Sequence, residues 1–105
     1  MRQVDLPSGA LRELVAVFGR YPDLQQVILF GSRATGRSTE RSDIDLATRG
    51  ILDRHRLGRL SLDLDEVAIP QECGVQAYEQ IHHAPLKAHI DRWGIAIYER
   101  ERSAL

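Results

Sequence analysis

Asp43 and Asp45 are separated by one residue in the alternating segment 42–47, where apolar Ile44 and Leu46 occupy the intervening positions. Side chains alternate across a strand, so this spacing predicts a half-buried strand with both aspartates on one face. Two carboxylates on one face repel each other unless a cation lies between them. Hard oxygen ligands combined with triphosphate oxygens suit magnesium, and two such ions would clamp an in-line displacement. The pair therefore predicts a magnesium site.

A glycine-serine pair, Gly31 and Ser32, directly follows the short apolar run 27–30. This run is β-favouring and predicts a buried strand that leads into a tight turn. A glycine at such a place lets the backbone approach a ligand closely, and amides at the start of a following helix can cradle phosphate oxygens. With the Ser32 hydroxyl as a further donor, the turn is typical of a phosphate-binding segment.

The segment GSRATGRSTERSDIDLA, residues 31–47, resembles the signature of the DNA polymerase β-like nucleotidyltransferases, G-S-x-A-x-G followed by S-D-x-D-L. The short chain and its ending APLKAHIDRWGIAIY, residues 84–98, are similar to the minimal nucleotidyltransferases that prokaryotes often encode beside a HEPN-domain protein. The resemblance implies an α/β (α+β) fold of the polymerase β-like type, a small mixed sheet with helices packed mainly on one face. It covers almost the whole chain, which we expect to be one domain, residues 1–105.

The resemblance also implies roles for individual residues. Gly31 and Ser32 would bind the β- and γ-phosphates with help from Arg33, and Asp43 and Asp45 would be catalytic and hold Mg²⁺. The implied reaction moves a nucleoside monophosphate, AMP from ATP, onto a hydroxyl and releases pyrophosphate. The implied acceptor is a tyrosine of a partner HEPN ribonuclease toxin, which would make this chain the antitoxin of the pair.

A third carboxylate of the family pattern usually stands four residues past a Leu-Pro or Ile-Pro pair. Counting from Ile69-Pro70 leads to Gly74, which has no side chain to offer. Glu72, two residues earlier on the same strand face, is the first candidate to replace it as a catalytic residue, and Asp65 is the second if the stretch around it is a strand rather than a helix. Two other classes of function therefore stay open: a degenerate antitoxin that binds its partner without transfer, and a nucleotidyl carrier to RNA ends or small molecules.

Hydrophobic periodicity predicts the remaining elements. Segment 53–69 fits either a strand or a helix, but a crossover between parallel strands takes about a dozen residues or more, so a helix is favoured. Before it we expect a helix over residues 8–18 with Ser8 as N-cap. After it we expect a strand over 73–78 with Val75 inward, a helix from Pro85 to Trp93, and a strand over 95–98.

Composition limits the class of protein. The chain has 105 residues, 43% hydrophobic and 28% charged, which is ordinary for one globular domain. Its formal charge of −1 argues against electrostatic binding of duplex nucleic acid.

The single cysteine, Cys73, cannot form an internal disulfide and is expected to be a small buried residue. No signal peptide or membrane span is evident, so we expect a cytoplasmic location without membrane contact; no pattern selects between self-association as a homo-oligomer and burial against a partner.

Other residues that could carry chemistry have simpler explanations. His82, His83 and His89 lack partners at zinc-ligand spacing, so we expect a polar loop with a capping role. Trp93 and Tyr98 could stack a nucleobase, but one helix face and one strand account for them as core residues.

Overall fold

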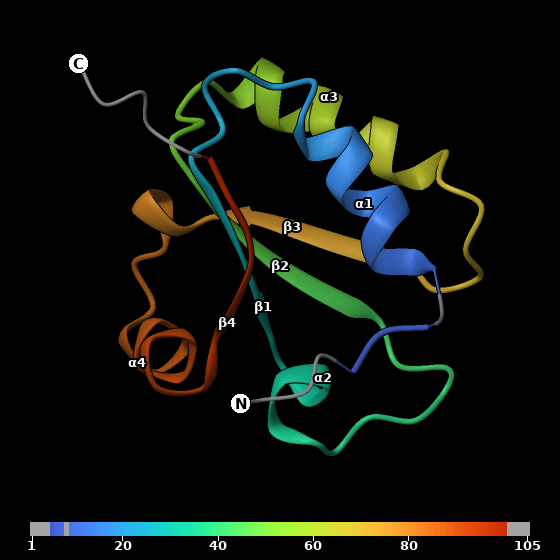
Figure 1. Cartoon of the computed structure of the whole chain (residues 1–105). Coiled ribbons are helices and arrows are strands. Elements are labelled where there is room, and N and C mark those ends of the chain that lie inside the picture. Colours follow the sequence, from blue (N-terminus) through green and yellow to red (C-terminus); the bar gives the residue numbers. More distant parts are fainter. Residues whose placement is uncertain (1–4, 8, 101–105) are drawn as a thin grey trace.

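A four-stranded mixed sheet forms the centre of the molecule in the computed structural model, which describes residues 5–7 and 9–100. The strands lie in the order β3-β2-β1-β4, where β1 is antiparallel to both β2 and β4, and β2 is parallel to β3. Figure 1 follows this sheet from the edge strand β3 to the edge strand β4. The elements are α1 (Ala10–Phe18), β1 (Gln26–Phe30), α2 (Ser32–Thr35), β2 (Ile44–Arg49), α3 (Arg54–Asp65), β3 (Cys73–Ala77), the 3₁₀ turn η1 (Tyr78–Gln80), α4 (Ala84–Trp93) and β4 (Ile95–Glu99).

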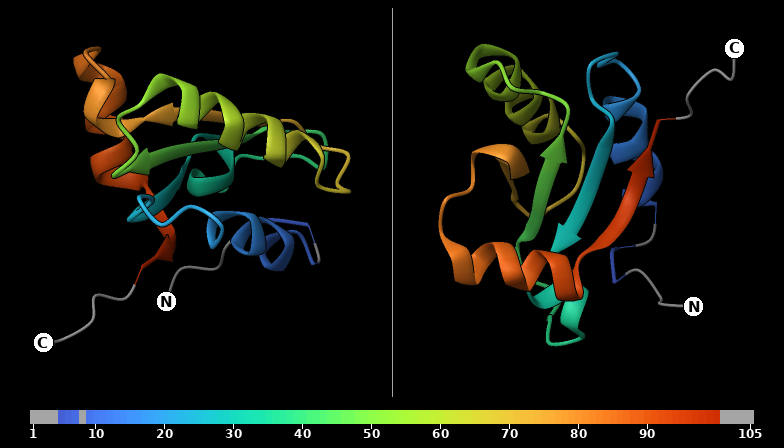
Figure 2. Two further views of the ribbon diagram at one scale, coloured as in Figure 1. Left: turned by 90° about the horizontal axis from the view of Figure 1, so that it is seen from above. Right: turned by 90° about the vertical axis from the view of Figure 1, so that its left-hand side faces the viewer.

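Helices α1 and α3 cover one face of the sheet, and α4 crosses the other, as the right-hand view of Figure 2 shows. The larger core lies under α1 and α3, where Leu14, Leu46 and Leu60 are fully buried. A smaller cluster, Phe30, Ala47, Ile81 and Ile90, joins the sheet to α4. Because α4 covers only part of its face, the end of the sheet near Asp45 is left half-buried rather than sealed.

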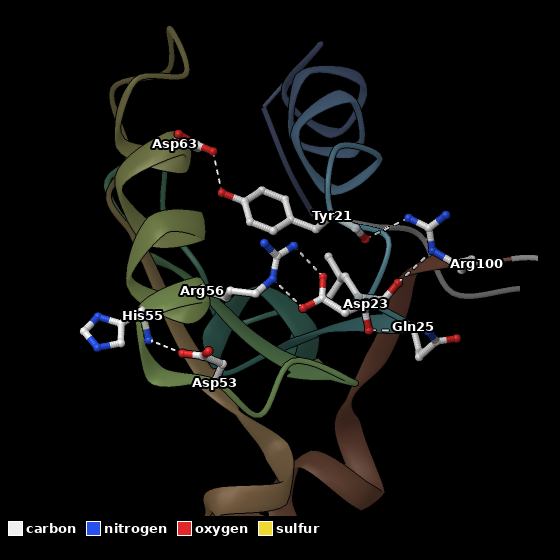
Figure 3. A network of polar contacts seen from close by, with 9 residues as sticks. Tyr21, Asp23, Gln25, Asp53, His55, Arg56, Asp63 and Arg100 are labelled. Atoms are coloured by element: carbon white, nitrogen blue, oxygen red, sulfur yellow. Dashed lines mark hydrogen bonds and ion pairs between the residues drawn. The ribbon is translucent and has the colours of Figure 1, made fainter.

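The predicted crossover helix is confirmed as α3, which joins the parallel strands β2 and β3. Its first turn is capped by Asp53, whose carboxylate accepts a hydrogen bond from the His55 backbone N–H at 2.7 Å. Two further contacts, drawn in Figure 3, tie α3 to the segment after α1. The Tyr21 hydroxyl donates to Asp63 at 2.5 Å, and the Arg56 guanidinium donates to Asp23 through two bonds of 2.6 Å.

Some predicted boundaries shift by one or two residues. The second strand begins at Ile44 rather than at Ser42 and continues to Arg49, and the third ends at Ala77. Helix α1 begins at Ala10 after Gly9, and the expected cap Ser8 lies outside the described residues.

The C-terminal aromatic residues divide between core and surface. Tyr98 packs against the larger core, with its ring 5.5 Å from that of Phe18, as expected. The core prediction for Trp93 is wrong, because its side chain is 40% exposed at the last position of α4. There the Arg92 guanidinium lies 5.3 Å from the indole ring.

Candidate active site

The turn after β1 depends on a glycine at position 31. Gly31 has φ of 77° and ψ of −154°, a region of backbone space that is essentially restricted to glycine. A Cβ atom at this position would also collide with the Asp45 carboxylate oxygen Oδ2. Glycine is therefore required twice, once by the backbone conformation and once by the close approach of Asp45.

Asp45 lies at the centre of this end of the sheet. It is in register with Phe30 on the antiparallel side and with Gly74 on the parallel side. A Cβ atom built on Gly74 would lie 3.6 Å from Asp45 Oδ1 and would meet no other atom within 4 Å. The carboxylate therefore lies between two glycines, with Oδ2 toward Gly31 and Oδ1 toward the open position above Gly74.

The electrostatics of Asp45 favour a bound cation. Burial raises the pKa of Asp45, and the nearby Asp43 carboxylate raises this pKa further, whereas a positive charge on His89 would lower it. Asp43 itself is exposed and immediately precedes β2. A hard divalent cation would relieve both the desolvation and the repulsion, and carboxylate oxygens are the ligands that Mg²⁺ prefers. The donor set therefore fits the ion that the sequence predicts.

His89 also lies at this site, on α4 and not in the polar loop with a capping role that was expected for it. Its Nε2 atom accepts a hydrogen bond of 3.0 Å from the Gly31 backbone N–H. The edge of its ring contacts Phe30, with centroids 6.2 Å apart at an interplanar angle of 75°. No sequence spacing links residues 31 and 89, so this contact follows only from the packing of α4 against β1.

The structure gives Arg33 a role that differs from the expected phosphate contact. Its side chain is only 4% exposed, and its guanidinium donates to four backbone carbonyls. These belong to Asp5, Thr39, Glu40 and Ser42, at 2.9, 3.2, 3.2 and 3.1 Å. The charge is thus used to hold the loop that leads into β2, and it positions the aspartates indirectly.

The two candidates for the third carboxylate do not join the aspartate pair. Glu72 is exposed before β3, where its carbonyl accepts the Ile44 N–H at 2.8 Å. Asp65 ends α3, which covers the opposite face, and it lies near the Cys73 thiol. Within residues 5–7 and 9–100, no three His, Cys, Asp or Glu side chains come together as metal ligands. Neither carboxylate therefore completes a triad with the pair.

Cys73 is half-buried and packs against the core on the face of the sheet that α1 and α3 cover. Burial raises the pKa of its thiol to about 11, and the carboxylates of Asp65 and Asp43 add to the shift. The thiol is therefore protonated near neutral pH and is a poor nucleophile there.

A glycine turn beside two aspartates on a small mixed sheet defines an α/β domain with a candidate nucleotide site. The sequence match extends this conclusion to a family. Residues 12–103 match the family described as Polymerase beta, Nucleotidyltransferase. The chain therefore belongs to the polymerase β-like nucleotidyltransferase family.

Solved structures support the same fold at low sequence identity. A chain of a crystal structure described as a toxin-antitoxin with AMP-PNP superposes with a TM-score of 0.70 and 21% identity, over 87% of this chain and 74% of that one. A chain from the structure of the tri-AMPylated Shewanella oneidensis HEPN toxin in complex with MNT antitoxin superposes with a TM-score of 0.65 and 19% identity, over 87% of this chain and 71% of that one. A chain from the structure of the toxin-antitoxin MntA-HepT superposes with a TM-score of 0.63 and 19% identity, over 87% of this chain and 71% of that one. The chain thus resembles MNT antitoxins that pair with HEPN toxins.

No curated protein matches this chain. In the described part of the molecule, no helix is long and apolar enough to cross a membrane.

Proposed function

We propose that this chain binds a nucleoside triphosphate with Mg²⁺ and transfers its nucleoside monophosphate, AMP from ATP, to a hydroxyl of a partner HEPN toxin. The observation that carries the proposal is the position of Asp45, with one carboxylate oxygen against the Gly31 turn and the other toward the open space at Gly74. Asp43 lies close enough to raise the pKa of Asp45. Family membership and the AMPylated HEPN toxin in the complex of a similar chain support the same reaction.

In the proposed reaction, the acceptor's hydroxyl oxygen forms a bond to the α-phosphorus of the nucleotide. The bond from that phosphorus to the oxygen bridging to the β-phosphate breaks, pyrophosphate leaves, and the hydroxyl proton passes to a base. Magnesium held by Asp43 and Asp45 would supply charge neutralisation at the phosphate oxygens. Gly31 and Ser32 would hold the β- and γ-phosphates, because Gly31 lets the backbone approach and Ser32 adds a hydroxyl donor.

The open space above Gly74 would then be the side from which the acceptor enters. β3 is an edge strand and Gly74 is exposed, so a partner can reach this side of Asp45. An in-line displacement requires the acceptor hydroxyl and the leaving pyrophosphate on opposite sides of the α-phosphorus. Entry of the acceptor from the Gly74 side would leave the Gly31 turn to the β- and γ-phosphates.

Labelling of the partner tests the proposal. The chain is mixed with labelled ATP, Mg²⁺ and the HEPN-type protein encoded beside it, and the label is located by mass spectrometry. We expect label on a hydroxyl side chain of the partner and its loss with Asp45→Asn. A partner that carries label equally with native chain and with Asp45→Asn would rule out this site as its source.

A second function, partner binding without transfer, is favoured by one observation. Asp45 faces Gly74 where the family pattern has a third carboxylate, and neither Glu72 nor Asp65 joins the aspartate pair. In this alternative the chain neutralises its partner by binding alone. A partner that forms a stable complex but acquires no label with Mg²⁺, Mn²⁺ or any other divalent ion would select it.

A further inference from the structure

His89 connects the C-terminal helix to the turn on which nucleotide binding is proposed to depend. It stands 58 residues from Gly31 along the chain, and its Nε2 accepts the Gly31 N–H at 3.0 Å. The ring is half-buried and fixed from the side by the edge contact with Phe30. The neighbouring residue Ile90 is buried in the cluster that joins α4 to the sheet. The imidazole is therefore held by packing before any ligand arrives.

We propose that His89 is a positioning residue for triphosphate binding, because its Nε2 lone pair sets the orientation of the peptide that begins the glycine-serine turn. The inference rests on the proposed function, since it assigns His89 to the same nucleotide site. His89 acts through Gly31 and touches no reacting atom. An acceptor nitrogen carries no proton, so the ring in this contact is neutral with its hydrogen on Nδ1.

The turn needs such an external contact because glycine alone does not define it. Without a Cβ atom, glycine populates many backbone conformations, and ordering it costs more entropy than ordering any other residue. On its carbonyl side Gly31 is held by the N–H groups of Ala34 and Thr35, at 3.0 and 3.2 Å. On its amide side the contact is His89. With both sides of Gly31 fixed, the start of Ser32 is held in one orientation beside Asp45.

Matched substitutions separate the acceptor atom from the packing of the ring. His89→Phe keeps an aromatic ring against Phe30 but removes the acceptor, whereas His89→Gln can place an amide oxygen near the position of Nε2. His82→Phe is the control, because it makes the same change at an exposed histidine outside the site. Each variant is titrated with ATP and Mg²⁺ by calorimetry, hydrogen exchange of the Gly31 amide is followed by NMR, and melting temperature confirms folding.

We expect His89→Phe to lose protection of the Gly31 amide and to bind Mg·ATP about 2- to 10-fold more weakly, the effect of one net hydrogen bond. His89→Gln should recover much of both, and His82→Phe should match the native chain. Native affinity in a folded His89→Phe would overturn the inference, as would equal losses in the Phe and Gln variants. If the native chain protects the Gly31 amide through His89 but binds no Mg·ATP, the proposed function fails while the contact itself is verified.

Discussion

Placing a carboxylate at position 74 is the perturbation that most changes the chemistry of the site. The residue is exposed on an edge strand, and its φ is not positive, so a side chain is tolerated by the backbone. The new Cβ would lie 3.6 Å from Asp45 Oδ1. The carboxylate of Gly74→Asp would therefore lie beside that of Asp45 on the side open to an acceptor.

The size of the effect follows from this distance. Two unit charges about 4 Å apart repel by about 1 kcal/mol in water and by about 4 kcal/mol at an effective dielectric constant of 20. Without metal, Gly74→Asp should therefore lower the melting temperature. With Mg²⁺ and ATP the added oxygen becomes a ligand and a base for the acceptor hydroxyl, and a positioned base is worth about 10²- to 10⁴-fold in rate.

The assay is the single-turnover rate of AMP transfer at saturating ATP and Mg²⁺. Gly74→Asp should be faster than the native chain, and Gly74→Asn, which has the same size without the charge, should not be. The native rate should be slow and should not change with Glu72→Gln, since Glu72 does not join the aspartate pair. A native chain that is already fast and is slowed by Gly74→Asp would refute this reasoning.

Three further predictions follow from individual contacts. Gly31→Ala should lower the free energy of unfolding more than Gly36→Ala does, as measured by chemical denaturation. Both glycines have a positive φ, which strains an alanine by about 1–3 kcal/mol, but only the Cβ at position 31 would meet Asp45. Arg33→Met should lose about 2–4 kcal/mol because it removes the guanidinium hydrogen bonds to four backbone carbonyls, whereas equal stability to an Arg37→Met control would contradict the role assigned to Arg33. Burial and the hydrogen bond to Asp63 raise the pKa of Tyr21 to about 12 from 10.0, so stability should be fully present below pH 10 and fall as pH rises to 12. Tyr21→Phe should lessen this loss of stability at alkaline pH, as measured by thermal denaturation. If Tyr21→Phe and the native chain had the same pH profile, Tyr21 would not be the group responsible.

The elements that depend on local pattern were predicted well. The alternation of Asp43 and Asp45 with apolar residues describes β2 within two residues, and connection length correctly resolved the ambiguous segment 53–69 as α3. The parallel pairing of β2 with β3, which sets Gly74 opposite Asp45, agrees with the crossover connection expected from the sequence. In each case the information lies in side-chain periodicity or in the reach of the chain.

The features that the sequence did not predict depend on contacts between distant segments. His89 looks like any other polar residue of α4, and only the packing of that helix beside β1 brings it to Gly31. Arg33 stands inside the motif, but its length lets the guanidinium reach back to the loop carbonyls instead of forward to a ligand. Trp93 continues the apolar helix face of Ile90, yet at the last residue of α4 its side chain is 40% exposed.

Calorimetric titration of the native chain with ATP in the presence and absence of Mg²⁺ tests the central claim most directly. We expect binding that requires Mg²⁺ and is lost in the double variant Asp43→Asn with Asp45→Asn, because both replacements remove charged ligands of the ion. The melting temperature of the double variant should stay close to the native value, since Asp43 is exposed and Asn relieves the repulsion at Asp45. A double variant that binds ATP and Mg²⁺ as tightly as the native chain would contradict the assignment of this site.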